Sequence, residues 1–134
     1  MKRFELQFES GDRFTAVLLE MDAPRTAKVF WDNIPHEAVV KHAKFSGEEI
    51  YFFLNEGANV EPENRLEPIA GDICYEAAGR PVVVIYYGNN IHVWAHGDHH
   101  LKNRFARIEG DLDALHRVGE RVHVGAEKVA VRRL

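Results

Sequence analysis

The amino-acid sequence predicts a mainly β fold, a closed or nearly closed antiparallel barrel with two short capping helices. Three observations carry this prediction. Segments that alternate apolar and polar residues recur along the 134 residues, as in half-buried strands. They follow one another too closely for the long crossovers that parallel strands require. No linker or shift in composition divides the chain, so we expect residues 1–134 to form a single domain.

The first elements are a hairpin and a helix. Arg3–Glu9 places aromatic and aliphatic side chains on one face and charges on the other, and Arg13–Glu20 returns after a turn that contains Gly11. Apolar residues then recur at helical spacing over residues 23–34. We expect Asp22 to cap this helix at its N-terminus.

Strands and a second helix complete the chain. The remaining predicted strands are Ala38–Phe45, Glu49–Leu54, Asp72–Ala77, Pro81–Tyr87, Asn103–Ile108, Arg121–Val124 and Lys128–Arg132. Val82–Ile85 is apolar on both faces, which predicts a central strand that is covered on both sides. A turn at Ala78-Gly79-Arg80 would join that strand to the one before it. We expect Asp111 to cap the second helix and Gly119 to end it.

Composition excludes several classes of protein. Seventeen basic and twenty-one acidic residues give a net charge of −4 without a basic block, which argues against a nucleic-acid partner. The longest apolar run, Val82–Tyr87, is far shorter than a membrane span of about 20 residues. The first residues lack the apolar stretch of a secretory signal, so we expect a cytoplasmic protein. The single Cys74 is expected to be a small core residue.

Several segments resemble cyclophilins. Glu20–Phe30 resembles the stretch in which an acidic residue, a Pro, a Lys or Arg, a Thr and a Phe open the first cyclophilin helix, and Leu112–Gly119 resembles the second helix. A closer resemblance, to small bacterial and archaeal cyclophilin-like proteins of unknown function, is carried by Gly47–Phe52, Gly71–Tyr75, Tyr86–Gly88, Asn103–Ile108 and Gly125–Val131. These resemblances imply a cyclophilin-like β-barrel.

The resemblance departs where prolyl isomerase chemistry would lie. Cyclophilins follow the first helix with a Phe-His-Arg strand and a Gln-Gly-Gly stretch, and the Arg is catalytic. Here no Arg lies between Arg25 and Arg65, and no Gln-Gly-Gly follows. Lys41 or Lys44 could supply a cation, but an ammonium does not replace a planar guanidinium. We therefore expect a protein without enzymatic activity, with a peptidyl-prolyl isomerase of low activity as an alternative.

Histidine is unusually frequent in one segment, since four of the eight histidines lie between residues 92 and 100. On an extended strand His92 and His96 would be about 13 Å apart, too far to share one Zn²⁺. Around Gly97, the histidines His96, His99 and His100 could converge on a metal, which keeps a metal-dependent enzyme as a second alternative. The favoured interpretation is a polar loop at a barrel end that faces solvent or a subunit contact, without metal or other cofactor.

Polar and aromatic residues near the predicted loop mouths define the expected binding site. The expected ligand-binding residues are Glu48, Tyr51, Tyr87, His92, Trp94, His96, His100 and Asn103. The adjacent carboxylates Glu48 and Glu49 should point to opposite faces of their strand, so that only one can face a given site. We expect this site to bind a small metabolite or a short peptide at one barrel end. Trp94 could instead anchor a contact between copies of the chain, and we expect a homo-oligomer.

Overall fold

Nine strands and two helices make up the part of the chain that the structure, a computed structural model, describes, residues 1–77 and 79–134. The strands are β1 (Arg3–Phe8), β2 (Arg13–Leu18), β3 (His36–His42), β4 (Gly47–Phe53), β5 (Arg65–Leu66), β6 (Asp72–Glu76), β7 (Val82–Asn90), β8 (Lys102–Glu109) and β9 (Glu127–Arg133). The helices are α1 (Pro24–Asp32) and α2 (Leu112–Val124). Ala78, in the predicted turn between β6 and β7, lies outside the described residues.

The strands form a closed antiparallel barrel, as predicted. Within the described ranges, eight strands follow one another in the order β2-β1-β9-β3-β4-β7-β6-β8, and pairing of β8 with β2 closes the ring. The short β5 adds to β8 outside the ring. Because closure leaves no strand edge in the ring unpaired, the barrel holds its wall residues in a fixed register.

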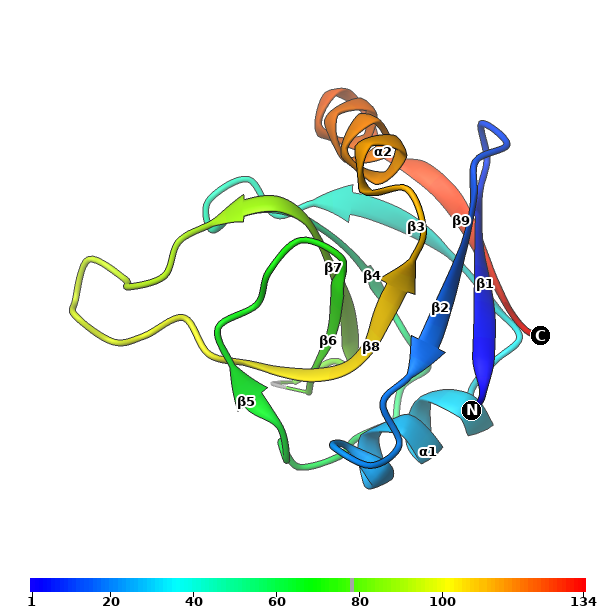
Figure 1. The fold of residues 1–134 in the computed structure, drawn as a ribbon, viewed down its shortest axis with the longest axis horizontal. Helices are drawn as coiled ribbons and strands as arrows, with labels where there is room; N and C mark the ends of the chain where they lie inside the picture. Colours follow the sequence, from blue (N-terminus) through cyan, green and yellow to red (C-terminus); the bar gives the residue numbers. More distant parts are fainter. Residues whose placement is uncertain (78) are drawn as a thin grey trace.

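The two helices lie at opposite ends of the barrel (Figure 1). Phe30 of α1 enters the core between Phe4 of β1 and Phe105 of β8, with ring centroids 4.7 and 4.9 Å apart. At the other end α2 buries Leu115, Val118, Gly119 and Val122. The amphipathic spacing of both helices therefore reflects their packing on the barrel ends.

The apolar patterns of β1 and β7 predicted correctly which of their faces are buried. In β1 the residues Phe4, Leu6 and Phe8 are buried in the core and alternate with partly exposed neighbours. Along the central β7, Val83 and Ile85 face the same core. Val84 and Tyr86 instead join the buried Cys74 in a second apolar cluster on the outer face of the wall. The run that is apolar on both faces is thus covered on both sides, as expected.

Two predictions at helix ends were wrong. Ala23, not Asp22, occupies the N-cap of α1, and no side chain among the described residues caps that helix. Gly119 does not end α2, which continues through Arg121–Val124, the segment predicted as a strand. The glycine serves packing instead, because a Cβ at position 119 would lie 2.4 Å from ring carbons of Tyr87. The predicted cap at Asp111 is confirmed by its bonds from the backbone N–H groups of residues 113 and 114.

Residues 91–101 form an arm between β7 and β8 that extends away from the barrel (Figure 1, yellow). An antiparallel bridge joins Val93 to His99, and the His100 N–H donates to the His92 carbonyl over 2.8 Å. This segment contains the four clustered histidines, so the sequence predicted its polar, loop-like character correctly. Neither described helix has the length and apolar character required to cross a membrane.

Candidate functional site

Strand β4 divides the candidate site residues between two places. Glu48 and Glu49 are neighbours on this strand and point to opposite faces of the barrel wall, as the alternation predicted. Glu48 points toward α2, and Glu49 points to the outer face covered by the arm. The two carboxylates therefore belong to two separate groups of polar side chains.

Glu49 is buried on the outer face of the wall. Its residue is only 5% exposed, and it lies opposite Tyr86 in the β4–β7 ladder. The Ser46 hydroxyl donates to Glu49 Oε1 over 2.5 Å, whereas Oε2 has no hydrogen-bond partner among the described residues. Burial raises the pKa of this carboxyl group above its usual range, and the Ser46 hydrogen bond opposes that shift. Its surroundings thus make Glu49 easier to protonate than a carboxyl group in water.

His100 lies beside Glu49 and comes from the arm. The imidazole is fully buried, with Nε2 3.4 Å from the Tyr86 hydroxyl and 3.9 Å from Glu49 Oε2. Its Nδ1 atom is also buried without a hydrogen-bond partner in the described chain. Burial lowers the pKa of His100, and the nearby charges of Lys102 and His92 act in the same direction. Burial also raises the pKa of the Tyr86 hydroxyl.

Trp94 covers this group from the solvent side. Its indole stacks on the His100 ring, with centroids 4.8 Å apart and planes at 29°, and more loosely on His96 at 6.3 Å. Glu49, Tyr86, His100 and Trp94 together are called the outer-wall site below. The site combines two polar side chains, each with one buried atom that lacks a partner among the described residues, with an aromatic face. Such a combination can recognise a flat ring bearing a polar group.

The other histidines of the arm remain exposed and do not join the outer-wall site. His92 and His99 both approach Glu67, with Nδ1 atoms 3.7 and 2.7 Å from its carboxylate oxygens. His96 lies 3.3 Å from Asp98. The metal candidates His96, His99 and His100 therefore have three different acidic partners, and the arm presents no common centre among its described donors.

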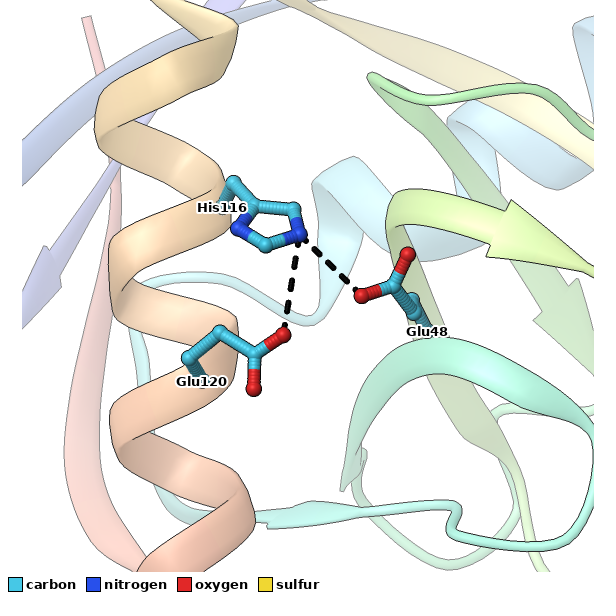
Figure 2. A group of neighbouring side chains, drawn as sticks. All are labelled: Glu48, His116 and Glu120. Carbon is cyan, nitrogen blue, oxygen red and sulfur yellow. Dashed lines mark hydrogen bonds and ion pairs between the residues drawn. The ribbon is translucent and has the colours of Figure 1, made fainter.

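Glu48 belongs to a cluster between α2 and the barrel end (Figure 2). His116 Nε2 lies 3.1 Å from Glu48 Oε2 and 3.6 Å from Glu120 Oε1. Glu48 Oε1 accepts the Asn89 N–H over 2.9 Å, and this hydrogen bond is the main reason that the pKa of Glu48 is lowered. Glu48, His116 and Glu120 are called the helix-side cluster below.

Tyr87 connects the helix-side cluster to further imidazoles. Its ring meets His116 edge-on at 5.3 Å, and its hydroxyl lies 2.7 Å from His42 Nε2. The His42 ring stacks on His123 of α2 at 4.3 Å. Burial raises the pKa of Tyr87 to about 12, and burial followed by the His123 charge lowers the pKa of His42. A row of titratable rings thus lies along the inner surface of α2.

The two remaining predicted residues lie outside both groups of titratable side chains. Asn103 is buried, accepts the backbone N–H groups of Glu63 and Asn64, and donates to the Thr26 hydroxyl. Its polar atoms therefore hold α1 and the segment just before β5 against β8. Tyr51 lies on the outer face of β4 and packs against the Cys74 cluster.

The structure thus brings together Trp94 and His100 of the predicted set, and separately Glu48 and Tyr87. Sequence reasoning missed Glu49 and Tyr86 as members of a site, because they meet only through the pairing of β4 with β7. It also left His116 out of the expected site. The spacing of His116 and Glu120 by one helical turn was the available signal, and the premature helix end at Gly119 hid it.

Two surface hollows of the described residues lie elsewhere on the barrel. One of about 450 Å³ is lined by residues of β1, β3 and β9, including Phe8 and Val39. Another of about 540 Å³ lies between β3 and the end of β4, near Phe53 and Arg80. Neither includes a member of the outer-wall site or of the helix-side cluster. The outer-wall site is closed by its own arm.

The fold and these residues define a class of protein. Its members are closed antiparallel barrels with polar groups on the wall and at one end. Within that class, residues 8–132 match the family described as "Protein of unknown function (DUF3830)". The chain belongs to this family. No curated protein matches the chain.

Two solved structures share the fold. The structure of McbB in complex with tryptophan aligns with a TM-score of 0.83 and 18% identity over 96% of this chain. This chain spans 44% of the length of that McbB chain. The solution structure of the hypothetical protein AF2241 from Archaeoglobus fulgidus aligns with a TM-score of 0.65 and 22% identity, over 99% of this chain and 95% of that one. At such identities the similarity shows the fold alone.

Proposed function

We propose that this protein is a non-enzymatic, cyclophilin-like barrel of the cytoplasm that binds a small metabolite at the outer-wall site. The ligand class we infer is an aromatic ring that carries a hydrogen-bond donor such as an amino group. The proposal narrows the expected ligand set to His100 and Trp94, adds Glu49 and Tyr86, and moves the site from the barrel end to the wall beside it.

One observation carries this proposal. Glu49 Oε2 and His100 Nδ1 are both buried, and neither has a hydrogen-bond partner among the described residues. A buried polar atom without a partner costs about 1–3 kcal/mol, so each of these two atoms would gain from a hydrogen bond to a ligand. A ligand that donates to Glu49 and accepts from or donates to His100 would recover that free energy.

The aromatic part of the ligand follows from Trp94. This side chain holds an indole against the His100 imidazole at 4.8 Å, so His100 offers a face on which a ring of that size stacks. Either the Trp94 ring is displaced by the ligand ring or it stacks upon it. The tryptophan that is bound in the McbB structure supports the same ligand class.

The test compares ligands that carry the ring, the amino-acid group or both. The thermal unfolding midpoint is measured with L-tryptophan, with indole, which keeps the ring and its N–H, and with L-alanine, which keeps the ammonium and carboxylate without the ring. At 100 times its Kd a ligand adds about 2.7 kcal/mol of stability, so we expect L-tryptophan to raise the midpoint by several degrees and the other two to raise it less.

Substitutions connect that effect to the site. We expect Glu49→Gln and Trp94→Ala to reduce the L-tryptophan shift, whereas Glu56→Gln, an exposed carboxylate on a distant loop, leaves it unchanged. Equal binding by wild type and Glu49→Gln would contradict the assignment of the site. No shift with any of the three compounds would contradict the ligand class.

A further inference from the structure

We propose that the helix-side cluster is a second site, which binds a divalent first-row cation such as Zn²⁺. One ligand atom each from Glu48, His116 and Glu120 lie within 4.8 Å of one another. Two carboxylate oxygens and one imidazole nitrogen are a donor set that such cations accept. Ligands at about 2.1 Å from one cation lie roughly 3.4 Å apart, so side-chain rotation alone would close this group around an ion.

The fold positions these three donors before any ion arrives. His116 and Glu120 lie one turn apart on α2 and project toward the barrel end, where Glu48 faces them from β4 (Figure 2). The Asn89 N–H holds Glu48 Oε1 and leaves Oε2 directed at His116. Gly88 makes room for this carboxylate, since a Cβ there would lie 2.4 Å from Glu48 Oε1.

The charges of the cluster also favour a cation. Both carboxylates converge on the same nitrogen, His116 Nε2, which carries at most one hydrogen. One proton cannot satisfy both, and two carboxylates with an imidazolium still sum to a charge of −1. A divalent cation would give each carboxylate and the imidazole a bond of its own. His123, 4.0 Å from the other oxygen of Glu120, places a second imidazole beside the group.

An ion can reach this cluster from solvent. The side chains of Glu48, His116 and Glu120 are 28%, 44% and 49% exposed. The cluster lies on the opposite face of β4 from the outer-wall site. Failure of one of the two proposals would therefore leave the other unaffected. Water would complete the coordination sphere of a three-ligand ion, as in open zinc sites.

The test uses the full chain without a histidine tag, treated with chelator and then dialysed. Titration calorimetry with Zn²⁺ and visible absorption with Co²⁺ are expected to show one ion per chain. We expect Glu120→Gln, at a half-exposed position, to weaken binding about tenfold or more, and Glu48→Gln to do the same. Thermal unfolding without metal checks that each variant is folded.

Glu67→Gln is the matched control, because it removes the carboxylate that lies between His92 and His99 of the arm. We expect this variant and Glu49→Gln to bind Zn²⁺ as the wild type does. Loss of binding in Glu67→Gln would transfer the ion to the arm and overturn the proposal. Absence of binding by the wild type, or unchanged binding by Glu120→Gln, would overturn it as well and leave the group as a triad bridged by a proton.

Discussion

Gly119 of α2 lies directly against the ring of Tyr87 on β7. A Cβ at position 119 would lie 2.4 Å from ring carbons of that tyrosine, closer than any real contact. The bare backbone lets the helix approach the barrel end, and the same tyrosine then meets His116 edge-on at 5.3 Å. The glycine therefore sets how closely the helix-side cluster is assembled.

Substitution of Gly119 by Ala should destabilise the protein. Alanine favours a helix by about 1 kcal/mol over glycine, but overpacking costs about 1–3 kcal/mol, and a contact this short lies at the upper end. We expect a net loss of about 1–2 kcal/mol in urea unfolding. Gly125→Ala is the matched control, since its Cβ would meet no atom within 4 Å and its φ of −163° suits any residue. Equal stability of both variants would contradict the packing argument.

Asp72 provides a second test of the barrel wall. This buried carboxylate accepts the Ile69 N–H over 2.9 Å and pairs with Arg104 and Arg107. Asp72→Ala leaves two guanidinium groups without their partner, so we expect a loss of about 3 kcal/mol in urea unfolding. Asp98→Ala, at an exposed position of the arm, should change stability by less than about 0.5 kcal/mol. A small effect at Asp72 would show that solvent already satisfies the two arginines.

The buried His100 predicts an acid-sensitive stability. Its pKa in the folded state lies below the usual 6.5, mainly because of burial. As the pH falls through 6.5, the unfolded chain takes up a proton that the native imidazole does not, so the free energy of unfolding decreases. We expect the loss of stability between pH 7.5 and 5.5 to be smaller in His100→Gln than in wild type. His96→Gln removes an exposed imidazole of the same arm and is the control. Identical slopes in wild type and His100→Gln would contradict this assignment.

The burial of Glu49 predicts the opposite dependence of stability on pH. Its pKa is raised above 4.5, mainly by burial, so the native state keeps a proton that the unfolded chain releases. The carboxyl group therefore destabilises the fold progressively as the pH rises from 4.5 through the folded-state pKa. A tenfold difference in proton affinity between the folded and unfolded states corresponds to about 1.4 kcal/mol. We expect Glu49→Gln to gain stability relative to wild type between pH 4.5 and 8. A constant difference across that range would show that Glu49 is not desolvated.

The fold was largely predictable because local patterns and the barrel agree. Alternation in Arg3–Phe8 and the apolar run Val82–Ile85 each reported a face that the closed wall does bury. The prediction at Gly119 was wrong because glycine after a helical pattern usually marks a C-cap. Here the glycine is required by close packing against Tyr87, which is distant in sequence. Local sequence carries no record of such a contact.

The sites were less predictable for a related reason. The sequence placed Glu48 and Glu49 on opposite faces, but it could not show which face would meet the arm and which would meet α2. The four clustered histidines drew attention to residues 92–100, yet only His100 is buried. The unpartnered atoms of Glu49 and His100 become visible only when the arm is placed over the wall.

The positions of Glu48 and Glu49 on β4 limit where residues can be inserted or deleted. A single residue inserted or deleted ahead of Glu48 would turn the later side chains of β4 to the other face, so that Glu48 and Glu49 would exchange faces. An even-numbered change would restore the original sides. The arm stands outside the barrel ladder, so its length can vary freely at the tip near Gly97. We therefore expect related chains to keep the alternation of faces along β4, while their arms differ in length.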